Sequence, residues 1–274
     1  MTYWDGFSYN QTLSLLVHGE PKVGKTWFGA SAPAPRLILD AEGGTQWLPS
    51  AKCYWDPRAE PPPILGQGHM VPGGEVYAYN WETCVVIMRD YTTMQSVYQW
   101  LAIGQHPFRS IIVDSVSEIQ KRAKDDIVGI GDMRTQDWGT LLARMEGLVR
   151  DMRDLTTHPT RPVQCVVIIA FTREQSGKFR PYVQGALSVT MPYFLDVIGY
   201  LFTQTLEDGQ LVRRLLVQPD SQFEAGERVG GRLGAVVDAP PNGPPGWNGP
   251  SIEQMLYTIY GQDPSGLYVP QATT

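Results

Sequence analysis

Cysteine is scarce in this sequence: the 274 residues include only three, at positions 53, 84 and 165, far apart and outside any C-x-x-C pair. This scarcity excludes a disulfide framework and a structural zinc site, and it is typical of a reducing compartment. Long apolar runs are also lacking, since the longest, Val166 to Phe171, is far shorter than the roughly 20 residues that span a bilayer. The first residues lack the basic segment and apolar stretch of a secretory signal, so we expect a cytoplasmic protein that does not enter a membrane.

Positive charge is in short supply as well. The 22 Lys and Arg residues are outnumbered by 28 Asp and Glu residues, which gives a net charge of −6. This balance excludes a strongly basic nucleic-acid binder but leaves room for a local basic groove. The hydrophobic fraction of 42% is that of a chain that folds around a core.

Glycine and proline are concentrated in two segments, 56–74 and 240–250. We interpret the first as a long excursion between structured elements, and the second as a linker, because it cannot sustain helix or sheet ladders. The predicted organisation is therefore a core over residues 1–239, followed by the linker and by a short helix and tail over 251–274. Ser251 is the predicted N-cap of that helix.

Apolar runs alternate with helical patterns along the core. Strands are predicted at 12–17, 36–39, 84–88, 110–113 and 163–171. Helices are predicted at 25–32, between the third strand and about residue 103, directly after the fourth strand, and over 136–155. Near-continuous Val, Ile and Leu strands separated by helices indicate an α/β fold, with a mostly parallel sheet covered on both faces. Two later runs, 197–205 and 211–217, flank Glu207-Asp208-Gly209 and predict an antiparallel hairpin.

A complete G-x-x-x-x-G-K-[ST] motif, which we call the phosphate loop, lies between the first strand and the first helix. Its residues are Gly19, Glu20, Pro21, Lys22, Val23, Gly24, Lys25 and Thr26. The two glycines are expected to permit backbone angles that a Cβ resists, so that the loop can wrap its N–H groups around phosphate oxygens. Lys25 would bring a positive charge to the β- and γ-phosphates, and the Thr26 hydroxyl would bind Mg²⁺.

Acidic residues follow two other predicted strands. Asp114 ends the strand Ile111-Ile112-Val113 and would hold Mg²⁺ through a water molecule, although an Asp at a strand end can also be a helix cap. Glu42 follows the strand that ends at Leu39, and it could orient or deprotonate an attacking water. A solvated acidic loop is the alternative interpretation of Glu42.

These segments together resemble the RecA-like ATPases, in particular the compact phage-encoded RecA-like single-strand annealing proteins. The resemblance covers residues 10–235 and rests on the phosphate loop, on Leu39-Asp40-Ala41-Glu42 and on Ile111 to Ser115. It implies a RecA-like P-loop NTPase that binds ATP and Mg²⁺ and hydrolyses ATP in a DNA-stimulated reaction, with Lys25 and Glu42 as catalytic residues. It further implies single-stranded DNA as a partner, a ring or filament of identical subunits, a possible single-strand DNA-binding partner protein and a role in phage recombination or annealing in the host cytoplasm.

The resemblance also directs attention to the segment after the fifth strand. RecA has a γ-phosphate-sensing amide there, and Thr172 is the residue that could take that role here. The following octapeptide, Arg173 to Arg180, carries three cations. Arg173, Lys178 and Arg180 could pair with DNA phosphates, while Phe179 or Tyr182 could stack on a base, although a polar hairpin tip would have a similar composition.

Other cations and aromatic residues carry weaker expectations. Arg228 and Arg232 could each be an arginine donated to the γ-phosphate of a neighbouring subunit, and ordinary surface arginines are the alternative. Arg213 and Arg214 should lie on opposite faces of a strand, and Trp138 is expected to serve packing. Two other functions stay open: a small-molecule kinase, which would need an Arg-rich lid, and a nucleotide-dependent assembly switch without significant catalysis.

Overall fold

The protein is described by a computed structural model that covers residues 11–65, 81–241 and 246–261. The part of the predicted excursion from residue 66 to 74 lies outside these ranges. So do residues 242–245 of the predicted linker and the tail after residue 261.

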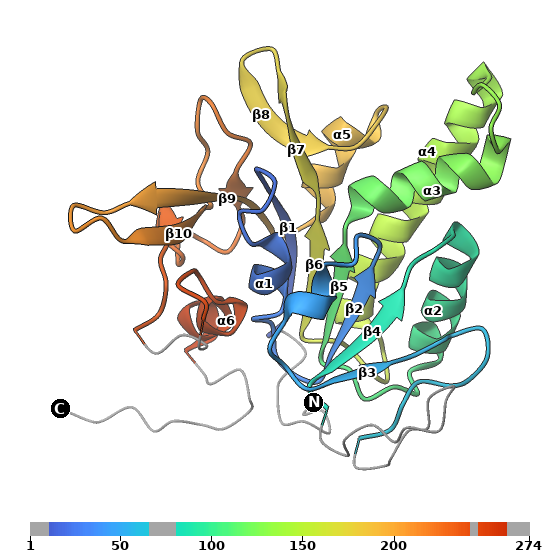
Figure 1. The fold of residues 1–274 in the computed structure, drawn as a ribbon, viewed down its shortest axis with the longest axis horizontal. Coiled ribbons are helices and arrows are strands. Elements are labelled where there is room, and N and C mark those ends of the chain that lie inside the picture. Colours follow the sequence, from blue (N-terminus) through green and yellow to red (C-terminus); the bar gives the residue numbers. More distant parts are fainter. Residues whose placement is uncertain (1–10, 66–80, 242–245, 262–274) are drawn as a thin grey trace.

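One large sheet forms the centre of the described molecule (Figure 1). It has ten strands in the order β12-β10-β9-β1-β6-β5-β2-β4-β3, with β11 paired to β9. The strands are β1 (Leu13–Gly19), β2 (Arg36–Asp40), β3 (Lys52–Tyr54), β4 (Thr83–Ile87), β5 (Ser110–Asp114), β6 (Cys165–Ile169), β9 (Val197–Thr205), β10 (Leu211–Leu216), β11 (Gly226–Glu227) and β12 (Val236–Val237). Two further strands, β7 (Phe171–Gln175) and β8 (Lys178–Tyr182), pair only with each other as a separate hairpin.

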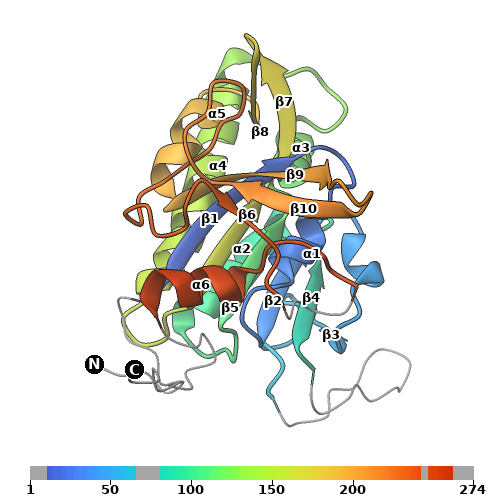
Figure 2. The same ribbon diagram turned by 90° about the vertical axis from the view of Figure 1, so that its left-hand side faces the viewer.

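Helices cover both faces of this sheet. They are α1 (Lys25–Gly29), α2 (Tyr91–Ile103), α3 (Val116–Val128), α4 (Thr135–Asp154), α5 (Leu187–Thr190) and α6 (Ile252–Tyr260). Figures 1 and 2 show α2, α3 and α4 on one face, and α1 and α6 on the other. The predicted α/β fold with a mostly parallel sheet and a late antiparallel hairpin, β9–β10, is confirmed.

Alternation along the strands explains the two-sided burial. In β2, Leu37 and Leu39 belong to the apolar cluster under α2–α4, whereas Ile38 belongs to the cluster under α1 and α6. The strand β5 repeats the pattern, with Ile111 and Val113 on the first face and Ile112 on the second. Because successive side chains of a strand point to opposite faces, a strand buried on both sides needs apolar residues at its centre, and the three central residues of β2 and of β5 are apolar.

Parallel pairing brings the motif residues to one edge. β1 pairs with β6, β6 with β5 and β5 with β2, all in parallel. Asp40 and Asp114 are direct register partners at the ends of β2 and β5. The phosphate loop leaves β1 at the same carboxyl edge, which is where α/β sheets bind ligands.

Some predicted elements differ from those observed. Helix α1 ends at Gly29 instead of residue 32, and the run 163–171 divides into β6 and the start of β7. The short strands β3, β11 and β12 were not predicted. Ser251 does occupy the N-cap position of α6, but its side chain makes no capping hydrogen bond.

The C-terminal segment packs onto the core instead of standing apart from it. Trp247 and the buried face of α6 join the same apolar cluster as β1 and α1. The Tyr260 hydroxyl donates a 2.6 Å hydrogen bond to the Thr12 carbonyl at the start of the described chain. Among the described residues, no helix combines the length and apolarity needed to cross a bilayer.

Candidate functional site

The phosphate loop follows β1 without a break. Gly24 has a φ of 107° and Lys22 a φ of 64°, so the loop contains two left-handed positions. Gly19 has no positive φ, which corrects the expectation that both glycines supply unusual backbone angles. Its small size matters for another reason: a Cβ at Gly19 would lie 2.3 Å from the Leu201 carbonyl oxygen of β9.

The Lys25 ammonium lies over the loop. Its Nζ donates to the carbonyl oxygens of Gly19, at 2.8 Å, and Glu20, at 3.0 Å. Burial lowers the pKa of Lys25, whereas the nearby carboxylates of Glu42, Asp114 and Glu20 raise it. A phosphate oxygen is a stronger acceptor for an ammonium than a neutral carbonyl, so the residue fits its predicted role.

Thr26 and Asp114 meet at the carboxyl edge of the sheet. The Thr26 hydroxyl donates a 2.6 Å hydrogen bond to Asp114 Oδ2. Burial raises the pKa of Asp114 to about 7, with Glu42 and Asp40 also raising it and the Thr26 hydrogen bond and Lys25 lowering it. The donor atoms are hydroxyl and carboxylate oxygens, the type that Mg²⁺ binds together with substrate phosphates, so these two residues fit a magnesium ion.

The turn after β2 borders the same edge. The Asp40 carboxylate accepts hydrogen bonds from the backbone N–H groups of Glu42, Gly43 and Thr45, which fixes the turn. The Glu42 side chain is exposed, and its charge acts on both Lys25 and Asp114. Gly44 abuts Thr26, since a Cβ at this glycine would lie 3.0 Å from Thr26 Oγ1. The structure therefore brings the phosphate loop, Asp114 and Glu42 together.

Comparison with known proteins agrees with this geometry. The AAA domain profile matches residues 11–229, which is most of the chain. The chain belongs to the AAA domain family. An AAA domain is a P-loop ATPase domain, so nucleotide binding and hydrolysis are its general activity.

Two further comparisons are less informative than the AAA domain match. One solved structure that matches is an ATPase from the type III secretion system of pathogenic bacteria, with 13% sequence identity and a TM-score of 0.40. The alignment covers 69% of this chain and 52% of that ATPase. A search of curated proteins finds no match.

The β7–β8 hairpin of this AAA domain carries the predicted DNA-binding residues. Lys178 and Arg180 both pair with the carboxylate of Glu224, at 3.8 and 3.6 Å. Phe179 is half-buried and stacks on Phe223 with ring centres 5.5 Å apart. The ring packs on Phe223, and stacking of Phe179 on a base stays a prediction.

Arg173 lies on the other side of the hairpin, 5.4 Å from the centre of the Tyr182 ring. Together with Arg180, Gln175, Gln184 and the exposed Trp138 of α4, these two residues line a cavity of about 470 Å³, which we call the hairpin groove. Trp138 is 41% exposed, so its ring lines the groove in addition to the packing role expected from the sequence.

Thr172, the candidate γ-phosphate sensor, contacts the strand that leads into the phosphate loop. Its Oγ1 lies 3.0 Å from Nδ1 of His18, whose Nε2 is 2.7 Å from the Glu224 carbonyl. Because a carbonyl only accepts, Nε2 of His18 carries the proton, and Nδ1 accepts from Thr172. Burial lowers the pKa of His18 to about 4, so the ring is neutral at pH 7.

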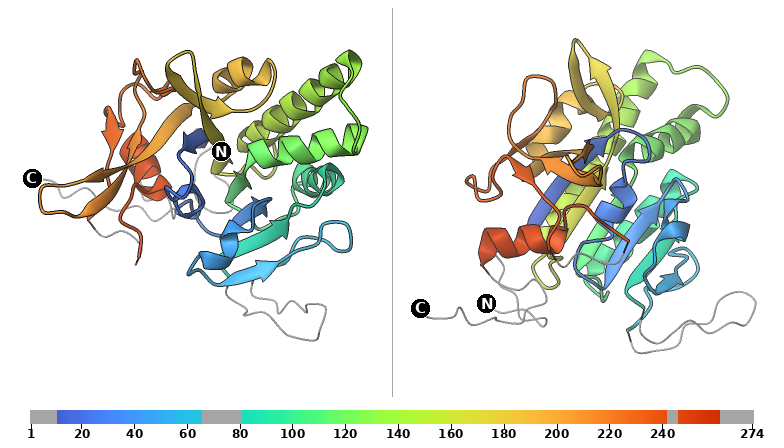
Figure 3. Two further views of the ribbon diagram at one scale, coloured as in Figure 1. Left: turned by 45° about the horizontal axis from the view of Figure 1, so that its top comes forward. Right: turned by 60° about the vertical axis from the view of Figure 1, so that its left-hand side comes forward.

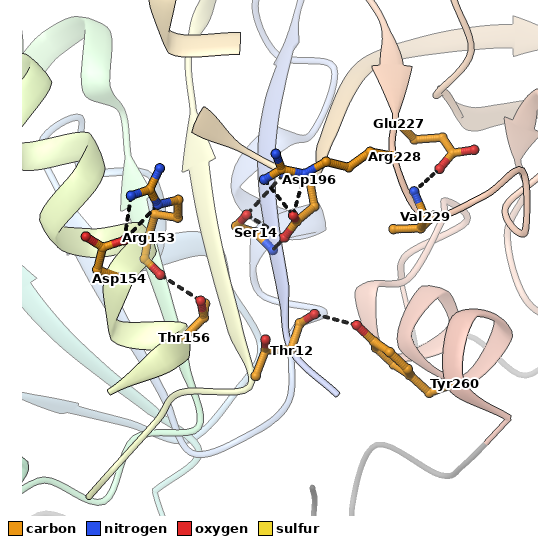
Figure 4. Close-up of polar contacts among 10 residues, drawn as sticks. All are labelled: Thr12, Ser14, Arg153, Asp154, Thr156, Asp196, Glu227, Arg228, Val229 and Tyr260. Carbon is orange, nitrogen blue, oxygen red and sulfur yellow. Dashed lines mark hydrogen bonds and ion pairs between the residues drawn. The ribbon is translucent and has the colours of Figure 1, made fainter. Parts of the chain in front are cut away.

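The two candidate trans-acting arginines lie at the opposite end of the sheet. Arg228 pairs with Asp196 at 2.8 Å, and Asp196 also accepts from the Ser14 hydroxyl at the amino end of β1 (Figure 4). Arg232 donates to the Ile259 carbonyl. The phosphate loop of the same subunit is roughly 20 Å away along the seven residues of β1. A role toward a neighbouring subunit stays a prediction.

Sequence reasoning missed the residues that contact the phosphate loop from the far end of the chain. Arg213 Nε donates to the Val23 carbonyl over 2.8 Å, and the buried Trp247 ring lies against Gly24. Arg213 is 190 residues from Val23 in sequence, so no local pattern could have signalled the contact. The alternation of Arg213 and Arg214 along β10 was the only available hint, because it placed one guanidinium on each face of the strand.

Proposed function

We propose that this protein binds and hydrolyses ATP at the phosphate loop and couples hydrolysis to binding of single-stranded DNA in recombination or strand annealing. Loop N–H groups and Lys25 would hold the phosphates, and the hydroxyl of Thr26 and the carboxylate of Asp114 would hold Mg²⁺. When bound, Mg²⁺ neutralises the charge on the β- and γ-phosphates. Glu42 would accept a proton from the attacking water.

The hairpin groove is the observation that carries the DNA part of the proposal. Arg173, which lies over the Tyr182 ring, and Arg180, which also pairs with Glu224, would offer two guanidinium groups to the phosphate backbone, while Trp138 and Tyr182 would offer aromatic faces to bases. None of the described residues that line the groove is acidic. On a chain with a net charge of −6, such a local combination of cations and aromatic rings favours a nucleic acid over a small neutral ligand.

A physical connection supports coupling between the two sites. The hairpin begins two residues after β6, which lies next to β1 in the sheet. Thr172 of β7 contacts His18, and His18 immediately precedes Gly19 of the phosphate loop. Movement of the hairpin on DNA would therefore act directly on the strand that carries the loop.

ATPase activity measured with and without single-stranded DNA tests the proposal. We expect turnover that depends on Mg²⁺ and rises when DNA is added. Turnover that requires a small phosphate acceptor would identify a kinase. Nucleotide binding without turnover in any condition would identify a nucleotide-dependent switch.

DNA titrations test the groove itself. Replacing Arg173 and Arg180 with Gln should make the slope of log affinity against log salt shallower by up to about 1.4, at about 0.7 for each phosphate contact. A control that removes the same charge elsewhere, Lys52→Gln with Arg150→Gln, should leave the slope unchanged. Trp138→Leu should weaken binding by about ten-fold, since one stacked base is worth about 1–3 kcal/mol. Equal slopes for the groove variant and the control would move the DNA site elsewhere.

A further inference from the structure

Arg213 and Trp247, from the C-terminal part of the chain, contact the phosphate loop from the β10 side, and Asn248 binds Arg213. Arg213 Nε donates to the Val23 carbonyl, and a terminal guanidinium N–H donates to Asn248 Oδ1 over 2.5 Å. The guanidinium also lies 5.1 Å from the centre of the Trp247 ring. We call Arg213, Trp247 and Asn248 the loop brace. Trp247 and Asn248 lie beyond residue 229, where the AAA domain match ends.

The Trp247 ring is held in one position. A Cβ on Gly24 would lie 2.6 Å from the ring, and a Cβ on Gly249 would lie 2.5 Å from it, so the indole fits between two glycines. Its Nε1 donates to the Pro250 carbonyl at 2.9 Å. The ring also stacks with Trp27 of α1, with centres 6.2 Å apart and an angle of 18°. Figure 3 shows the β9–β10 hairpin beside α1 and the loop that leads into it.

The segment that carries Trp247 is tied to β10 through its backbone as well. The Arg213 N–H donates to the Asn248 carbonyl over 3.0 Å, and the Asn248 side-chain amide donates to the Leu211 carbonyl. Arg213 therefore bonds the C-terminal segment and the phosphate loop at once. The brace is a continuous connection from β10 through Trp247 to Gly24.

The shape of the loop explains why it benefits from outside support. A left-handed angle is unfavourable for Lys22, which carries a Cβ, and such a conformation persists only where the surroundings fix it. A loop that must direct several N–H groups at the same phosphates loses conformational freedom on binding. Holding it in the bound shape beforehand removes that loss and increases affinity.

We propose that the loop brace holds the phosphate loop in its nucleotide-binding shape, so that Arg213, Trp247 and Asn248 are positioning residues for a nucleoside triphosphate. This inference rests on the proposed nucleotide binding at residues 19–26. The brace acts through the loop backbone, and it makes part of the nucleotide site depend on residues outside the matched AAA domain.

Titration of the full chain with a fluorescent ATP analogue and Mg²⁺ tests the brace, at a temperature well below unfolding. Arg213→Gln should weaken affinity by about ten-fold, the worth of one hydrogen bond from a charged donor. The matched control is Arg214→Gln, one residue along β10. Arg214 pairs with Asp238 and Gln204, and its variant should bind like the wild type.

Variants of Trp247 provide an independent measurement. Trp247→Leu should also lose about ten-fold in affinity, while Trp247→Phe, which keeps a flat ring between the glycines, should stay within about three-fold. The variants should raise KM and leave kcat within about two-fold, because the loop shape is needed equally by substrate and transition state. A merely destabilised protein would not separate KM from kcat in this way.

The outcomes distinguish the brace from the nucleotide site. Wild-type affinity in both Arg213→Gln and Trp247→Leu, with binding lost in Lys25→Ala, would overturn the brace and keep the site. Equal losses for Arg213→Gln and Arg214→Gln would also overturn the brace, since they would report general loosening of β10. No binding by the wild type would overturn the proposed function and the brace with it. If Arg213→Gln does not fold, the comparison of Trp247→Phe with Trp247→Leu decides.

Discussion

Replacement of Gly24 by Ala should destabilise the fold through two separable effects. The φ of 107° is one that L-residues rarely adopt, and a left-handed angle costs about 1–2 kcal/mol. The new Cβ would also lie 2.6 and 2.9 Å from two carbons of the Trp247 ring. Overpacking of this kind costs about 1–3 kcal/mol, so the expected loss in the free energy of unfolding is about 2–5 kcal/mol.

Two other glycines separate the contributions. Gly43→Ala carries the backbone penalty alone, because its φ is 79° and no atom lies within 4 Å of the new Cβ, so we expect a loss of about 1–2 kcal/mol. Gly147→Ala, inside α4 and with nothing within 4 Å of its new Cβ, should stabilise the protein by roughly 0.5–1 kcal/mol.

Urea unfolding of the three variants measures these differences directly. The predicted order of stability is Gly147→Ala above wild type, then Gly43→Ala, then Gly24→Ala. When Trp247→Ala is added to Gly24→Ala, the overpacking cost should disappear and the backbone cost should remain. A double-mutant cycle reports the overpacking cost as the coupling energy between the two positions. If Gly24→Ala is no less stable than Gly43→Ala, the packing of Trp247 against the phosphate loop is wrong.

Three further expectations concern single residues. Lys25→Ala should weaken nucleotide affinity by at least about ten-fold, because a hydrogen bond to a charged group is worth about 1.5–3 kcal/mol; unchanged affinity and turnover in an ATP-analogue titration and ATPase assay would remove the site. Glu42→Gln should keep nucleotide affinity and lower turnover roughly 10²–10⁴-fold, and turnover within about three-fold of wild type would leave Glu42 as a solvated acidic residue. His18 has a pKa of about 4 in the fold against a usual 6.5, so it stays neutral while the unfolded chain takes up a proton. The free energy of unfolding should therefore fall as pH drops from 6.5 to 4, by up to about 3 kcal/mol, and urea titrations across this range should show a weaker dependence in His18→Gln.

The sheet could be predicted from sequence because its central strands are buried on both faces. Such strands are near-continuous apolar runs, and each run from Leu13 to Ile169 that we assigned as a strand is one in the structure. β3, β11 and β12 escaped prediction because two or three residues carry no measurable periodicity. The carboxyl-edge residues were found because the parallel order of strands brings their ends together.

Residues whose roles depend on distant contacts were not predictable. Trp138 lies on an amphipathic helix, where the pattern suggests packing. The groove that its ring lines is formed together with the β7–β8 hairpin, which is distant in sequence. Phe179 follows a cation in a polar octapeptide, yet its ring stacks on Phe223, more than forty residues later. In the sequence Arg213 is an ordinary strand arginine, and only the structure shows that its guanidinium binds the Val23 carbonyl of the phosphate loop. Local pattern identifies the chemistry of these side chains but not their partners.

The close approach of Gly19 to the Leu201 carbonyl changes how the first glycine of the motif should behave under selection. Position 19 admits no Cβ unless β1 moves away from β9, and those two strands pair over five residues at the centre of the sheet. A library randomised at this position and sorted only for folded, protease-resistant protein, with nucleotide left out, should therefore still return glycine. The same library at Lys25 should return many residues, because that side chain is required by the ligand and not by the sheet.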